Sequence, residues 1–141
     1  MSVKIIKDNT KKVLGAMRGD NLKQAVRAGA IVLEGAVKIS MSAASHTGRM
    51  YGRHRASAPG ETPAVDTSIL VNSISTWDIS ANETEAWAGC GTGIVYGEWL
   101  EFGTSKMQAR PFMRPGLDNN LEKIKAVIRK YAKHEIEGAT S

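Results

Sequence analysis

Cysteine is almost absent from this chain of 141 residues, since Cys90 is the only one and no internal disulfide can form. Long apolar runs are missing too. The longest, at residues 28–33, falls far below the roughly 20 residues that span a bilayer. The first ten residues lack the apolar core of a secretory signal peptide. We therefore expect a protein that is made inside a cell and has no membrane segment.

Catalytic and cofactor motifs are also missing. The three histidines, His46, His54 and His134, do not have the spacing of metal ligands, and a single cysteine cannot complete a structural zinc site. GCGTGIVYG at 89–97 has the glycines of a phosphate loop, but it lacks a following Lys-Ser/Thr and a βαβ setting. No serine lies in a GxSxG motif. We expect no enzyme, no cofactor and no metal.

What is present is a composition typical of a globular protein, with 23% charged and 42% hydrophobic residues in 15.2 kDa. This size predicts a single domain over residues 1–141. The net charge is +5, but residues 66–105 carry six acids and no Lys or Arg. Such charge blocks are satisfied either inside the chain or by neighbouring copies, and the sequence leaves both alternatives open.

Hydrophobic periodicity and turn residues predict an α+β fold, in which a small antiparallel hairpin-based sheet is flanked by a long helix in the N-terminal half and by a C-terminal helix. The expected elements are a short helix at 8–17, an amphipathic helix at 20–43, a long loop at 44–65, a brief helix capped by Asp66, strands at about 74–79 and 85–91, a short helix from Tyr96 that Gly103 ends in a left-handed conformation, and a terminal helix whose last residues, 138–141, fray.

The loop at 44–65 carries Arg49, Arg53 and Arg55, with no acid before Glu61. These arginines suit salt-sensitive contacts with phosphates, but a solvated loop has the same composition. The chain's aromatic residues gather further along, and six of the eight lie between Trp77 and Phe112. We expect most of them to fill a core, yet so small a domain rarely hides all six. We expect at least two of them to lie between subunits.

Two stretches resemble a known family. Tyr96 to Asp118 reads YGEWLEFGTSKMQARPFMRPGLD, and residues 58–74 read APGETPAVDTSILVNSI. Both are similar to segments of the tail-completion, or head–tail joining, proteins of long-tailed double-stranded-DNA bacteriophages. The similarity is close over about 40 residues, and the order of features along almost the whole chain also resembles that of the family. One departure is Ser68, where the family usually has Gly, and we interpret this serine as the start of a helix and not as a strained residue.

The resemblance implies a structural virion protein, made in the host cytoplasm, that forms a homo-oligomeric ring, commonly of six subunits. The ring is located at the head-proximal end of the tail, and its expected partners are the head–tail connector, the tail terminator and tube proteins, and the DNA in the channel, with no membrane. We expect Arg49, Arg53 and Arg55 to line the channel or to contact a neighbouring ring, and to become ordered only in the assembly. The predicted subunit interface consists of Tyr96, Glu98, Trp99, Glu101, Phe102, Arg110, Phe112 and Arg114.

Within this interface, Glu98 and Glu101 are expected to face a neighbour's arginines, and Phe112 is expected to dock as a rigid anchor between Pro111 and Pro115. The alternative is a small basic nucleic-acid-binding module, which would bind duplex DNA with steep salt dependence and without self-assembly. A hydrolase would need an acid–base pair that converges in a pocket.

Overall fold

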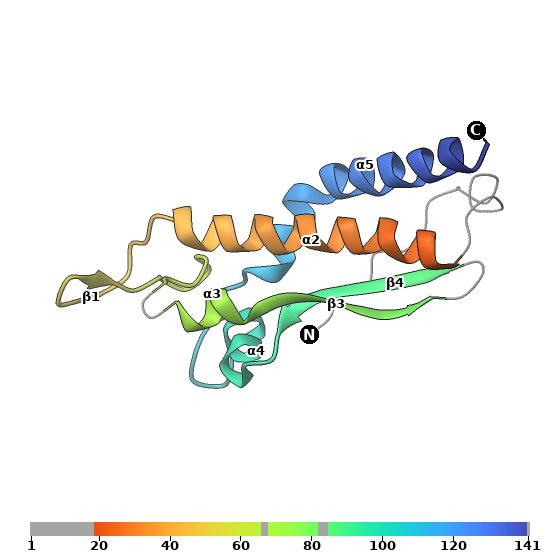
Figure 1. Cartoon of the computed structure of the whole chain (residues 1–141). Helices are drawn as coiled ribbons and strands as arrows, with labels where there is room; N and C mark the ends of the chain where they lie inside the picture. Colours follow the sequence, from red (N-terminus) through yellow and green to blue (C-terminus); the bar gives the residue numbers. More distant parts are fainter. Residues whose placement is uncertain (1–18, 66–67, 82–84, 141) are drawn as a thin grey trace. The chain divides into compact units, whose positions relative to one another are not determined.

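The computed structural model describes the backbone of residues 19–65, 68–81 and 85–140 (Figure 1). The fold is α+β, as predicted, with two long helices and two small antiparallel sheets. The helix predicted at 8–17 and the cap predicted at Asp66 lie outside the described residues. The elements are α2 (Gly19–Ala43), β1 (Met50–Tyr51), β2 (His54–Arg55), α3 (Ile69–Ser73), β3 (Ile74–Ala81), β4 (Ala86–Thr92), α4 (Val95–Phe102) and α5 (Met113–Thr140).

The chain forms two compact units, and the boundary between them falls inside α2, β3, β4 and α5. Neither unit is therefore a single stretch of sequence. The first contains residues 34–75 and 91–120, which include both segments that carry the family resemblance. Among the described residues, the second contains 19–33, 76–81, 85–90 and 121–140.

The second unit has a core of small and branched side chains contributed by α2, β4 and α5. Leu22 and Val26 are buried on one face of α2, as their helical spacing predicts. Ala86 and Ala88 alternate along β4, and Ile128 of α5 packs against the same cluster. The buried residues of this cluster thus follow the helical spacing predicted for α2 and the alternation predicted for β4.

The first unit contains the loop predicted at 44–65, and part of that loop is a β-hairpin. Strands β1 and β2 pair antiparallel, with Met50 opposite Arg55 and Tyr51 opposite His54. The two-residue turn begins with Gly52, whose φ of 64° is the positive value that a type II′ turn requires at this position. The segment thus has local structure within a single chain.

Ser68 precedes α3 in the left-handed conformation, with φ 62° and ψ 1°, and its side chain makes no capping hydrogen bond. Ser68 therefore stands at the start of a helix, as predicted, but the prediction that it is not strained is wrong. A serine in this conformation is strained, because its Cβ crowds the following carbonyl oxygen.

We expect Ser68→Gly to raise the free energy of unfolding by about 1 kcal/mol, because Gly adopts a positive φ without this crowding. Ser68→Ala is the control. It should change stability by less than about 0.5 kcal/mol, whereas loss of a true cap costs about 1 kcal/mol. Urea denaturation of the three proteins measures both effects. A destabilised Ser68→Ala protein together with no gain from Ser68→Gly would contradict the expectation.

Candidate interaction surface

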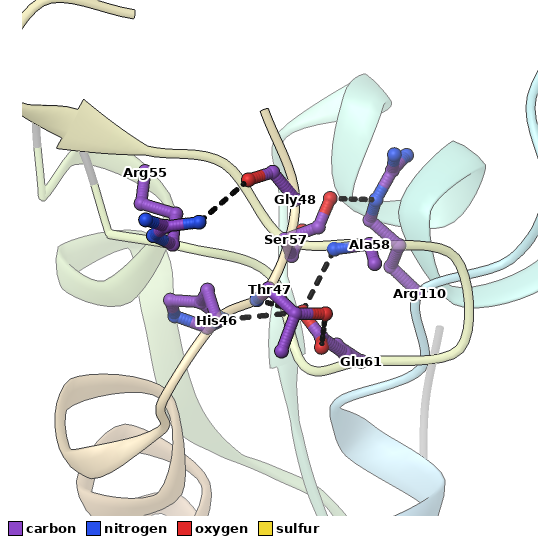
Figure 2. Close-up of polar contacts among 8 residues, drawn as sticks. All are labelled: His46, Thr47, Gly48, Arg55, Ser57, Ala58, Glu61 and Arg110. Atoms are coloured by element: carbon purple, nitrogen blue, oxygen red, sulfur yellow. Dashed lines mark hydrogen bonds and ion pairs between the residues drawn. The ribbon is translucent and has the colours of Figure 1, made fainter. Parts of the chain in front are cut away.

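The two segments that carry the resemblance, 58–74 and 96–118, lie together in the first unit. The Gly60 N–H donates to the Ala109 carbonyl at 2.9 Å. The Arg110 Nε donates to the carbonyl of Ser57 at 3.2 Å, as Figure 2 shows. In addition, the Arg110 N–H donates to the Leu100 carbonyl at 2.6 Å. The bond between Gly60 and Ala109 thus connects the two segments within one chain, and Arg110, predicted to lie at a subunit interface, bonds the residue just before the first segment.

Helix α4 presents a row of large apolar side chains to solvent. Val95 is 64% exposed, Trp99 51% and Phe102 69%, and their i, i+4, i+7 spacing places them on one side of the helix. Tyr96 is also exposed, beside this row. We call Val95, Tyr96, Trp99 and Phe102 the α4 patch. Contiguous apolar side chains of this size on a surface are typical of interaction sites.

The two glutamates of α4 have different surroundings, although the sequence analysis assigned them the same role. Glu98 is exposed. Glu101 is only 6% exposed, and its two carboxylate oxygens accept the backbone N–H groups of Phe112, Met113 and Arg114 at 2.8, 3.0 and 2.9 Å. Since α5 begins at Met113, Glu101 satisfies N–H groups that the first turn of a helix leaves without a partner. Its negative charge also suits the helix N-terminus.

The predicted interface residues at the start of α5 also include a buried side chain and an exposed one. Phe112 is 1% exposed and is among the largest buried side chains of the chain. Arg114 is exposed and pairs with Asp118, one helical turn further on, at 3.2 Å. Glu101, Phe112 and Arg110 thus have defined intramolecular positions. The proposed interface therefore excludes these three residues.

The hairpin of β1 and β2 carries the basic residues of the loop. Arg49, Arg53 and Arg55 are all exposed, and so are the side chains of Met50 and Tyr51. The Arg49 guanidinium lies 5.6 Å from the centre of the Tyr51 ring. Arg55 donates to the carbonyl of Gly48 at 3.3 Å (Figure 2). We call this stretch, residues 49–55, the basic hairpin.

Glu61 holds the base of the basic hairpin together, a role that the sequence analysis missed. Figure 2 shows its carboxylate accepting the Ala58 N–H at 2.8 Å and the Thr47 N–H at 3.1 Å, and it also accepts the Thr47 hydroxyl. The hydroxyl bond, then the bonds from Ala58 and Thr47 N–H, lower the pKa of Glu61 from 4.5 to about 2, and His46 makes a smaller contribution. Thr47 and Glu61 are 14 residues apart, so no local motif signals this contact.

Replacing Glu61 with Gln should make stability less dependent on pH. The folded pKa lies below the unfolded value, so the carboxylate stabilises the fold above about pH 4.5, and this contribution is lost as the pH falls toward 2. The difference in Tm between wild type and Glu61→Gln should therefore be largest above pH 5 and should disappear near pH 2. Thr47→Val, which removes only the hydroxyl, should reduce the pH dependence of Tm by a smaller amount than Glu61→Gln does. Parallel Tm curves for wild type and Glu61→Gln would contradict this assignment.

A cavity of about 360 Å³ lies in the first unit, beside the hairpin base and α4. Its lining includes His54, Ile69, Tyr96 and Arg110. In the described part of the chain, no group of three or more His, Cys, Asp or Glu side chains is placed to hold a metal ion. None of the described helices is long and apolar enough to cross a bilayer.

The chain matches no protein-family model, and no curated protein or solved structure is detectably similar to it. The resemblance of residues 58–74 and 96–118 to the head–tail joining proteins therefore stays a prediction from the sequence.

Proposed function

We propose that this protein is a non-enzymatic component of a bacteriophage virion, a ring subunit that joins the tail to the head connector. The observation that carries the proposal is the α4 patch. Three of its four residues lie inside the segment that resembles the joining proteins, on a helix whose Glu101 is fixed to the start of α5 by three hydrogen bonds, from Phe112, Met113 and Arg114. A rigid apolar face of this kind binds another protein with little cost in ordering.

The arrangement of charge also supports an assembly role. A closed ring needs two different surfaces on each subunit, because each copy meets its neighbours head to tail. The first unit has an apolar face with the exposed acid Glu98 and, on a different element, the basic hairpin. In the proposed ring, the arginines of the hairpin contact a neighbouring subunit, an adjoining ring or the DNA in the channel.

The test is electron microscopy of particles assembled with and without the protein in the phage that encodes it. We expect filled heads beside detached tails when the protein is missing, and joined particles when wild-type protein is supplied. A variant with Val95, Trp99 and Phe102 each replaced by Ser should fold but should fail to restore joining. Normal joining in the absence of the protein would refute the proposal.

The matched control replaces two exposed isoleucines of α2, Ile31 and Ile39, with Ser. This change removes exposed apolar side chains outside α4 and should leave joining intact. The nucleic-acid-binding alternative would instead be favoured by salt-dependent duplex binding of the isolated protein, abolished by replacing the three arginines of the basic hairpin and unaffected by the α4 changes.

A further inference from the structure

We propose that the basic hairpin of one copy of this chain docks on the α4 patch of the next copy. The inference rests on the proposed ring, and it names the two surfaces that meet. On α4, the residues Val95–Phe102 include Glu98 and no basic residue. Glu98 is exposed, and no hydrogen bond or ion pair joins its carboxylate to the rest of the described chain. Helix α4 therefore combines the apolar α4 patch with an acid whose side chain has no partner among the described residues.

The basic hairpin has the complementary character. It carries three exposed arginines and no acid between residues 49 and 55. Met50 and Tyr51 are 46% and 61% exposed, so the same short element also offers apolar side chains. Aromatic residues and arginines are the types that contribute most to binding at interface centres. Both surfaces thus offer apolar side chains, and their charges are opposite.

The two surfaces do not cover each other within one chain. The hairpin and α4 belong to the same unit, yet Tyr51, Trp99 and Phe102 all remain exposed there. Pairing between identical surfaces is also unfavourable, because it would bring arginines against arginines and Glu98 against Glu98. The complementary contact is therefore heterologous, the type that closes a ring.

The charge pattern favours a second copy over nucleic acid as the occupant of this surface. Phosphates would pair with the hairpin arginines, but Glu98 would repel phosphates from α4, and the apolar side chains of the α4 patch would stay uncovered. A second copy covers both surfaces at once. The DNA contact proposed for the hairpin becomes an alternative outcome of the test.

The test is a charge swap in the full-length protein, with self-association measured by sedimentation. Glu98→Arg alone, and Arg49→Glu with Arg53→Glu, should each weaken association by about tenfold or more, because like charges then meet at the contact. Arg55 is left in place because it also bonds the Gly48 carbonyl. An equimolar mixture of the two variants should recover association to within about threefold of wild type, since alternating copies again bring opposite charges together.

Matched controls change the same amount of charge elsewhere on exposed residues. Glu122→Arg is the control for α4, and Lys123→Glu with Lys130→Glu is the control for the hairpin. Both should associate like wild type. Unchanged association of either α4 or hairpin variant, failure of the mixture to recover, or a wild-type protein that stays monomeric would overturn the inference.

The joining assay separates this inference from the proposed function. If joining requires the protein but the charge swaps have no effect on association, the function stands and the contact is wrong. If particles join without the protein, the function fails whatever the variants do. Loss of duplex binding in the hairpin variant, with association unchanged, would assign the arginines to nucleic acid.

Discussion

Replacing Glu101 with Ala is expected to lower the free energy of unfolding by about 3 kcal/mol, which corresponds to a fall in Tm of roughly 10 °C for a chain of this size. The carboxylate accepts three backbone N–H groups at the start of α5, and those of Phe112 and Met113 form buried hydrogen bonds. Removing the acceptor leaves these donors without a partner away from water. Each such group costs about 1 to 3 kcal/mol, more when the lost partner is charged.

The variant series Glu101→Ala, Glu101→Gln and Glu98→Gln separates this role from a general effect of charge on α4. Glu101→Gln keeps one acceptor oxygen and should fall between wild type and Glu101→Ala. Glu98 is exposed on the same helix, and its replacement should change stability by less than about 0.5 kcal/mol. Thermal unfolding followed by circular dichroism measures all three. Equal effects at Glu98 and Glu101 would contradict the capping assignment.

The second large effect is expected for Gly103→Ala, at the end of α4. The residue has φ 78° and ψ 175°, a backbone region that only Gly occupies without strain. A Cβ atom there would also lie 2.9 Å from the Ala109 nitrogen and 2.9 Å from the Met107 oxygen, both backbone atoms. We expect a loss of roughly 3 kcal/mol from the strain and the overlap together.

Gly93→Ala is the matched control, because a Cβ at this exposed glycine meets no atom within 4 Å. Its effect should be within about 0.5 kcal/mol of wild type. Urea denaturation of the two variants measures the difference between them. Equal stability of the Gly103→Ala and Gly93→Ala proteins would show that the bend after α4 tolerates a side chain.

The prediction for Gly103 was right about the end of the helix and wrong about the conformation. Helix α4 ends at Phe102, with the Gly103 N–H donating to the Trp99 carbonyl at 2.8 Å. The ψ of 175° is not that of a left-handed cap, because the chain turns at once into the bridge between Thr104 and Met107. Sequence spacing locates a helix end, but the path that follows depends on contacts made further along.

The long elements could be predicted because their signals are local. The spacing of Leu22, Val26 and Leu33 predicted the helix that is observed as α2, and alternation with turn residues predicted β3 and β4. The brief helix observed as α3 and the start of a helix near Pro115 were predicted on similar grounds. In each case, the residues that decide the structure lie within a few positions of one another.

The candidate site could be predicted only in part, because burial depends on distant partners. Tyr96, Trp99, Phe102 and Glu98 are exposed, and so are available for the predicted interface. Glu101 looks equivalent to Glu98 in a helical pattern, yet it is buried, because the chain returns eleven to thirteen residues later with three N–H groups to satisfy. The contact between Thr47 and Glu61 was missed for the same reason.

The sequence by itself determined the fold class, the extents of α2, β3 and β4, and the concentration of aromatic residues and acids around α4, because these follow from periodicity and composition. Only the tertiary structure decided which side of α4 faces solvent, that Ser68 has a positive φ, and that residues 58–74 and 96–118 lie together. These features arise from hydrogen bonds and packing between residues far apart in the chain, and no local pattern encodes such contacts.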